Sequence, residues 1–241
     1  MDFDVGSRVI FKLDNRLQRG RVTRVLPQRR RIVTDSGRRV SVPARRLRYS
    51  PDRVLILETP LDRALRSTRS YGLMMQQWLA AYGVDVLYER VHTIGTVRRF
   101  LSREGKNIAT RYVHIMGHGF HSGRRSGTCL KLTFERLHLV EQADIFRGLH
   151  GKILIFSCCG IGADRRALEA VKEASGAAGV IAYRVEVEDW YTNLSEALLY
   201  DRLLNTNLSA QKAVDLVNNL LDWGGIRLQL RITRRPVLVC V

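Results

Sequence analysis

The sequence predicts an α/β protein in two parts: a small antiparallel β-barrel over residues 1–50, and a mostly parallel sheet with helices over residues 51–241. Three observations support this division. The first fifty residues form short alternating runs, the rest alternates aliphatic runs with helical stretches, and positive charge is concentrated in the first part. The change of pattern at Pro51 places the boundary between two domains.

Residues 1–50 contain four short runs typical of strands. The runs are RVIFKL, GRVTRVL, RIVTD and RRVSVP, and the segment DSG at 35–37 predicts a hairpin. Short antiparallel strands of this kind most simply form a barrel that is Src-homology-3-like or Tudor-like. Because alternation places polar side chains outside, we expect the following arginines there: Arg21, Arg24, Arg29, Arg30, Arg31, Arg38 and Arg39.

The net charge of +17 is unevenly distributed. Residues 1–50 hold 14 Lys and Arg against 4 Asp and Glu, which leaves 26 against 19 for the remaining residues. Basic surfaces attract nucleic acid and acidic proteins, so the barrel is a candidate docking site for either, with Arg29, Arg30 and Arg31 as contacts. The alternative is a solvated outer face, and the barrel has few aromatic residues on which bases would stack.

Residues 51–241 alternate between strand and helix patterns, which predicts a parallel sheet with helices on both faces. Two further helices and a closing pair of strands follow near the C-terminus. The predicted strands are RVLILET, VDVLYERV, YVHIM, KILIFS, GVIAYRV, IRLQLRI and RPVLVCV, and the predicted helices span residues 65–82, 96–103, 165–174, 194–204 and 210–221.

Composition argues against several classes of protein. The chain has no run of about 20 apolar residues, which a membrane-spanning helix needs, and its N-terminus does not resemble a secretion signal. Four cysteines in 241 residues do not form a disulfide framework. We therefore expect a cytoplasmic protein that makes no membrane contact, and we expect no cofactor.

Polar residues follow two of the predicted strands where each strand ends. The strand YVHIM is followed by GHG at 117–119, and KILIFS by CCG at 158–160. If the strands are neighbours, their ends lie about 5 Å apart, and His118 faces Cys159 across a cleft. A thiolate beside an imidazole is suited to attack on a carbonyl, and glycine lets backbone N–H groups approach a developing oxyanion. The pattern therefore favours acyl transfer.

These residues resemble the caspase-like cysteine peptidases of clan CD, most closely the CHAT and separase-like branch. That branch typically shows a strand ending H-x-x-G-H-G, a later strand ending S-A-C-x-T-G, and a segment like G-x-I-x-x-x-W-x-V-x-D. This chain has HIMGHG at 114–119, SCCGIG at 157–162 and GVIAYRVEVED at 179–189, in the same order. The resemblance covers roughly residues 52–222 and leaves the basic barrel outside it.

The resemblance implies a caspase-like three-layer sandwich and a cysteine endopeptidase that acts on a protein partner. It makes His118 the catalytic histidine and Cys159 the nucleophile. The amides of Gly119 and Cys159 would form the oxyanion hole, while Cys158 takes an alanine position, where it packs.

The same resemblance assigns substrate binding to an acidic turn. Asp189 matches the aspartate that binds a basic residue before the scissile bond in separase-like members, and Glu186 and Glu188 add to its charge. The implied cleavage site follows Arg or Lys. Prokaryotic relatives of this type commonly serve defence, including antiviral defence, or cell-death pathways. A solvated acidic loop is the alternative interpretation of this turn.

Three positions depart from the family pattern. Val185 replaces the tryptophan, Ile161 replaces the threonine, and Ser157 stands where metacaspase-like members carry an aspartate. The last change leaves Asp189 to determine specificity. The alternative to an enzyme is a catalytically inactive scaffold whose basic barrel binds nucleic acid or an acidic protein.

The histidines and the sheet edge raise two further questions. His114, His118 and His121 repeat at intervals of four and three, which would suit a metal only on a helix, and the glycines argue for a strand and loop. We therefore predict no metal site and expect His114 in the core or behind the site. Relatives also associate through a sheet edge, so a homo-oligomer is one expectation, and the C-terminal strands would serve or block that edge.

Overall fold

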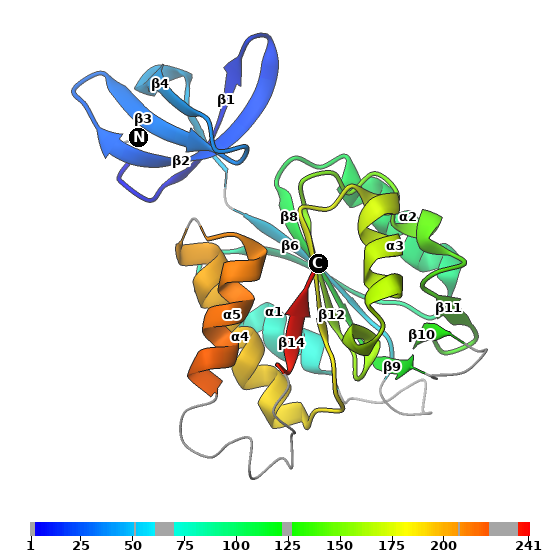
Figure 1. The fold of residues 1–241 in the computed structure, drawn as a ribbon. Coiled ribbons are helices and arrows are strands. Elements are labelled where there is room, and N and C mark those ends of the chain that lie inside the picture. The colour runs from blue at the N-terminus through cyan, green and yellow to red at the C-terminus, as the bar shows by residue number, and fades with distance from the viewer. Residues whose placement is uncertain (1–2, 51, 61–69, 122–126, 207, 222–235) are drawn as a thin grey trace. The chain divides into compact units, whose positions relative to one another are not determined.

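The computed structural model describes residues 3–50, 52–60, 70–121, 127–206, 208–221 and 236–241 (Figure 1). Within these residues the protein is mixed α/β, with 5 α-helices and three sheets. The chain divides into two compact units, residues 1–52 and 53–241. Among the described residues, no helix is both long and apolar enough to cross a membrane.

The N-terminal unit is a five-stranded antiparallel sheet in the order β4-β3-β2-β1-β5. The predicted hairpin is confirmed, because β3 and β4 pair in antiparallel fashion across a turn in which Gly37 has a φ of 84°. Inward side chains form a core of their own, which includes Val9, Phe11 and Ile32. The strands are β1 (Arg8–Leu13), β2 (Arg16–Val25), β3 (Arg29–Thr34), β4 (Arg39–Pro43) and β5 (Arg48–Tyr49).

The prediction that Arg30 faces solvent is wrong. Side chains alternate along a strand, so three consecutive arginines cannot all point outward. Arg29 and Arg31 are exposed, whereas Arg30 is buried. Its guanidinium donates hydrogen bonds to the carbonyl oxygens of Phe3 at 2.7 Å and Leu26 at 2.8 Å. Arg30 therefore stabilises the unit and is removed from the set of candidate contacts with a partner.

Two other buried arginines hold the end of this unit. Arg8 and Arg19 contact the Asp52 carboxylate at 3.1 Å and 3.0 Å, and Arg8 also contacts Asp35 at 2.8 Å. Burial raises the pKa of Asp52, although both guanidiniums oppose that shift. The cluster ties β1 and β2 to the last residue of the unit.

The second unit contains a six-stranded sheet in the order β14-β13-β12-β8-β6-β7. Five strands are parallel and β14 is antiparallel to β13, which confirms the predicted mostly parallel sheet. The predicted strand IRLQLRI lies outside the described residues. The strands are β6 (Arg53–Glu58), β7 (Asp85–Arg90), β8 (Thr110–Met116), β12 (Ile153–Ser157), β13 (Gly179–Tyr183) and β14 (Leu238–Cys240).

Helices cover both faces of this sheet, as predicted (Figure 1). Helices α2 (Ile94–Gly105) and α3 (Arg165–Ser175) pack on one face, and α1 (Tyr71–Ala81), α4 (Asp189–Asn205) and α5 (Ala210–Leu221) pack on the other. Residues 65–69 of the first predicted helix lie outside the described residues, and Ser70 caps α1 by accepting a hydrogen bond from Leu73. Helix α4 begins at Asp189, earlier than predicted.

The structure also contains a small three-stranded sheet that the sequence pattern does not predict. It consists of β9 (His118–His121), β10 (Thr128–Lys131) and β11 (Arg136–His138) in the order β11-β10-β9. Strands of three or four residues are too short to show a clear period of two. Three 3-10 segments complete the described elements: Ala44–Arg46 in the first unit, and Ala143–Phe146 and Ile161–Ala163 in the second. Because β9 follows β8 directly, this sheet determines the course of the backbone at His118.

Candidate active site

The two strands that carry the histidine and cysteine motifs are neighbours, as the predicted cleft requires. β8 and β12 pair in parallel with Met116 opposite Ser157, so both strands end at the same level of the sheet. The Gly117 amide donates a hydrogen bond to the Ser157 carbonyl oxygen at 3.2 Å. His118 and Cys159 therefore leave the sheet at the same edge, where ligands commonly bind to parallel sheets.

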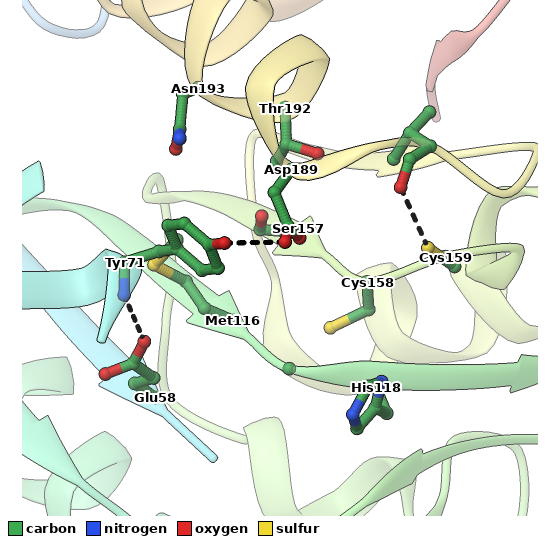
Figure 2. Close-up of a pocket in the computed structure, with 12 residues that line it drawn as sticks. Glu58, Tyr71, Met116, His118, Ser157, Cys158, Cys159, Asp189, Thr192 and Asn193 are labelled. Carbon is green, nitrogen blue, oxygen red and sulfur yellow. Dashed lines mark hydrogen bonds between the residues drawn. The ribbon is translucent and has the colours of Figure 1, made fainter. Parts of the chain in front are cut away.

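A pocket of about 180 Å³ lies at this edge (Figure 2). Its wall is built from the ends of β6, β8 and β12 and from the first turns of α1 and α4. The structure thus brings predicted residues from three separate motifs to one cavity. The lining residues are Glu58, Tyr71, Met116, Gly117, His118, Ser157, Cys158, Cys159, Val187, Asp189, Thr192 and Asn193.

The adjacent cysteines have different environments. Cys158 is 1% exposed and belongs to the core cluster on the α2 and α3 side, and its thiol donates to the Ile115 carbonyl oxygen at 3.6 Å. Burial raises the pKa of the Cys158 thiol well above its usual value, and Cys159 and Glu196 add to the shift. Cys159 is half-buried, and its sulfur lies 3.8 Å from the Val187 carbonyl oxygen. The two thiols point in different directions (Figure 2).

Gly119 must be glycine for the two motifs to approach. A Cβ atom there would lie 2.8 Å from Cγ1 of Ile161 and 3.0 Å from Cβ of Cys158, and closer still to the Cys159 carbonyl oxygen. The start of β9 therefore packs directly against the backbone of the cysteine pair. Gly160 has a φ of 71°, a left-handed conformation that favours glycine, and it turns the chain into the segment 161–163.

His118 is the first residue of β9 and is exposed. Further along the same strand, Nδ1 of His121 lies 2.8 Å from the Thr128 hydroxyl, which donates to the Asp164 carboxylate at 2.7 Å. Asp164 also caps α3 by accepting a hydrogen bond from Ala167. His121 thus helps to anchor β9, while His118 lines the pocket. Among the described residues, no group of three or more His, Cys, Asp and Glu side chains is placed to hold a metal ion.

Asp189 supplies negative charge to the pocket from the first turn of α4. It accepts a hydrogen bond from the Tyr71 hydroxyl at 2.6 Å. A carboxylate in this position is also favoured by the positive end of the helix dipole. Glu186 and Glu188 are exposed and do not line the pocket. Of the three predicted acidic residues, only Asp189 therefore reaches the cavity.

Two lining residues, Glu58 and Tyr71, were not predicted. Glu58 ends β6, is 1% exposed, and accepts hydrogen bonds from the backbone amides of Tyr71 at 2.8 Å and Gly72 at 3.0 Å. Its other oxygen accepts from the hydroxyls of Ser70 and Tyr88, each at 2.6 Å. The carboxylate thus holds the start of α1, which places Tyr71 against Asp189. The sequence signal that could have identified Glu58 is a carboxylate at the end of an apolar strand.

A buried polar network lies behind the pocket, two residues before the end of β8. His114 is fully buried on β8, with Nδ1 3.1 Å from the Tyr200 hydroxyl and Nε2 3.3 Å from the Glu196 carboxylate. Glu196 also accepts a hydrogen bond from the Tyr183 hydroxyl at 3.2 Å. These contacts join α4 to β8 and β13, and therefore support the helix that carries Asp189. The expectation that His114 lies in the core is confirmed.

No model of a known protein family matches the chain, and no curated protein matches its sequence. The function is therefore inferred from the pocket, from the contacts of its lining residues and from the motifs that supply them.

Proposed function

We propose that the chain is a cysteine endopeptidase that cleaves a protein partner after an arginine or lysine residue. The observation that carries the proposal is the register of β8 and β12, which brings His118 and Cys159 to one pocket together with Asp189. A nucleophile, an acid–base group and a carboxylate for a basic side chain are the parts that this hydrolysis needs.

In the proposed reaction, His118 takes the thiol proton and the Cys159 sulfur attacks the carbonyl carbon of the scissile bond. The amides of Gly119 and Cys159 donate hydrogen bonds to the resulting oxyanion. His118 then donates its proton to the leaving amine, the C–N bond breaks and a thioester remains. Water, deprotonated by His118, attacks the thioester, releases the new carboxylic acid product and allows the proton to return to sulfur.

Cys159 is the proposed nucleophile because a substrate must reach the sulfur, and the thiolate is the reactive form. The half-buried Cys159 lines the pocket with His118. Cys158 is almost inaccessible, and burial raises the pKa of its thiol. The packing role that the motif predicts for Cys158 is consistent with both observations.

Asp189 is the proposed partner of the basic side chain before the scissile bond. Guanidinium and ammonium groups bind most strongly to a carboxylate that is held in place and partly shielded from water. The Tyr71 hydroxyl holds the Asp189 carboxylate, and Glu58 in turn holds the backbone of Tyr71. Tyr71 is therefore a positioning residue. Glu58, the second carboxylate in the pocket wall, adds to the negative charge of the pocket.

We also propose finer descriptions of the two units. The second is a caspase-like three-layer sandwich, which is supported by a six-stranded, mostly parallel sheet between α2 and α3 on one face and α1, α4 and α5 on the other. The first is a Src-homology-3-like or Tudor-like barrel, which is supported by five short antiparallel strands around a core of their own.

The experiment that tests the function compares fluorogenic peptides that differ only in the residue before the scissile bond. We expect cleavage after Arg and Lys, and no cleavage by the Cys159→Ala or His118→Ala variants. Asp189→Asn should lower kcat/KM for these peptides about a hundredfold, since a charge pair in a shielded site is lost. Glu186→Gln is the matched control, because it removes an exposed carboxylate outside the pocket.

Two results would contradict the proposal. If the wild-type chain hydrolyses no peptide and no candidate partner protein, it is not a peptidase and an inactive scaffold takes its place. If Glu186→Gln lowers kcat/KM as much as Asp189→Asn does, general acidity and not the pocket carboxylate determines specificity.

A further inference from the structure

The outer surface of the N-terminal unit has an unusual charge distribution. Strands β2, β3 and β4 together contain eight arginines and no aspartate or glutamate. A surface without a binding role generally mixes charges of both signs, because like charges repel one another. Most of these arginines fall into two groups, those bonded within the unit and those exposed on one face of the sheet.

Part of this charge is accounted for by contacts within the unit. Arg19 is buried against Asp52, and Arg30 is buried against backbone carbonyl oxygens. On the turn before β4, the exposed Arg38 pairs with Asp14 at 3.1 Å. The buried guanidiniums of Arg19 and Arg30 stabilise the fold and cannot reach a partner, and the charge of Arg38 is already paired with a carboxylate.

Four exposed arginines of these strands share one face of the sheet, which we call the arginine face. They are Arg24, Arg29, Arg31 and Arg39. Arg24 lies directly opposite Arg31 in the β2–β3 ladder, and Arg29 points the same way two residues along β3. On β4, Arg39 is opposite Val33, which lies two residues beyond Arg31. None of the four has a carboxylate within 4.0 Å among the described residues.

This arrangement costs stability in the free protein. Like charges directly opposite each other on neighbouring strands destabilise a sheet, and here Arg24 and Arg31 are such a pair. Paired strands are about 4.8 Å apart and alternate residues about 6.7 Å apart, so the four guanidinium groups lie within one compact patch. A polyanion laid across the patch would relieve the repulsion.

A groove continues the arginine face at its Arg29 end. It has a volume of about 810 Å³ and is lined by segments 26–29 and 43–45, including the exposed Arg45. The guanidinium of Arg29 is held across the β3–β4 pair by hydrogen bonds to the Ser41 hydroxyl at 3.0 Å and carbonyl oxygen at 2.6 Å. One cation of the face is thus already oriented beside a concave surface.

We propose that the arginine face and this groove bind the phosphate backbone of double-stranded nucleic acid without reading its sequence. Arginine forks bind phosphate oxygens through paired hydrogen bonds. Strands β2, β3 and β4 contain no aromatic residue, so the face has no platform on which single-stranded bases would stack. The exposed Tyr49 is on β5, at the opposite edge of the sheet from β4.

An acidic protein is the competing partner, and the same composition argues against it. Protein interfaces usually contain a central aromatic or other large apolar anchor. Around the half-buried Val33, the arginine face carries charged and small polar side chains spread over three strands, and it has no aromatic residue. Such a surface suits a partner whose charge repeats regularly, as phosphates do along a duplex.

The test measures binding of the full chain to a short fluorescent duplex of mixed sequence at several salt concentrations. In the double variant Arg24→Gln/Arg31→Gln, we expect the slope of log K against log salt to fall by about 1.8, at roughly 0.9 per lost phosphate contact. At 0.1 M salt the affinity should fall by roughly tenfold per guanidinium. The Cys159→Ala variant should bind like the wild type, so this test is independent of peptidase activity.

The matched control is Arg38→Gln/Arg98→Gln, which removes the same charge from two exposed arginines that are paired with Asp14 and Asp144. It should leave the salt slope almost unchanged. The proposal is overturned if the duplex does not bind, if both double variants weaken binding equally, or if polyglutamate competes as well as the duplex at equal charge. Thermal melts check that both variants are folded.

Discussion

The two adjacent cysteines should have separable roles: we expect the stability of the fold to depend on Cys158 and the peptidase activity to depend on Cys159. Cys158 is 1% exposed in the core, so Cys158→Ala removes a buried sulfur atom and a weak hydrogen bond to Ile115. An atom of this size contributes about 1 kcal/mol to the free energy of unfolding. For a unit as long as residues 53–241, that loss lowers Tm by about 2–4 °C.

The half-buried Cys159 should behave in the opposite way. Cys159→Ala removes a sulfur that solvent already reaches, so its effect on the free energy of unfolding should stay within about 0.5 kcal/mol. Loss of a catalytic nucleophile should lower kcat by at least about 10⁴-fold. Cys158→Ala, in contrast, should keep kcat/KM within a fewfold of the wild type, since its sulfur does not touch the substrate in the proposed mechanism.

The assay combines calorimetric melts with hydrolysis of an arginine peptide, both on the same preparations. Brief alkylation at about pH 8 provides a third measurement, because an accessible thiol reacts first. We expect label on Cys159 before Cys158, which is buried, and before Cys240, for which burial raises the pKa of the thiol to about 11. Full activity in Cys159→Ala, or loss of activity in Cys158→Ala with Tm unchanged, would refute the assignment.

Three other side chains carry predictions of their own. Gly119→Ala should destabilise the fold by about 1–3 kcal/mol and reduce peptide hydrolysis, because its Cβ meets packed atoms, whereas Gly95→Ala has room and should melt like the wild type. Tyr71→Phe removes the donor to Asp189 and should raise KM for arginine peptides about tenfold with a smaller change in kcat; equal effects on peptides with an uncharged residue at that position would contradict it. Burial raises the pKa of Glu104, but surrounding hydroxyl, amide and guanidinium groups lower it more, so the net pKa is below the usual 4.5. Its stabilisation is present above that value and lost as the pH falls through the folded-state pKa, so Tm measured from about pH 5 to 3 should fall less steeply in Glu104→Gln.

Much of the second unit was predictable because long apolar strands and amphipathic helices leave clear periods in the sequence. The segment KILIFS became β12 with all five residues of the strand buried, and YVHIM became the end of β8. Short elements leave no such period. β9, which carries His118, has four residues and only one large apolar side chain, so its pairing with β10 emerged from the structure alone.

The candidate site was predictable where a motif carried it and unpredictable where packing did. Cys159 and Asp189 were identified from motifs, and both line the pocket. Glu58 and Tyr71 belong to no motif, and they join the site because β6 is adjacent to β8 and because Glu58 caps the helix that begins at Tyr71. Arg30 is a residue for which the prediction from composition is wrong. Composition indicated that it belongs to a basic surface, but strand alternation places its side chain inside the unit.

By itself, then, the sequence determined the two-part division, the α/β class, and the positions of His118 and Cys159 just past the ends of two buried strands, because hydrophobic periodicity and glycine placement are local properties of the chain. Only the tertiary structure decided that β8 and β12 are neighbours, that Cys158 is buried while Cys159 is half-buried at the pocket, and that Glu58 and Tyr71 stand beside Asp189. The reason is physical: strand order and side-chain burial depend on contacts between segments far apart in the chain, and local patterns do not specify those contacts.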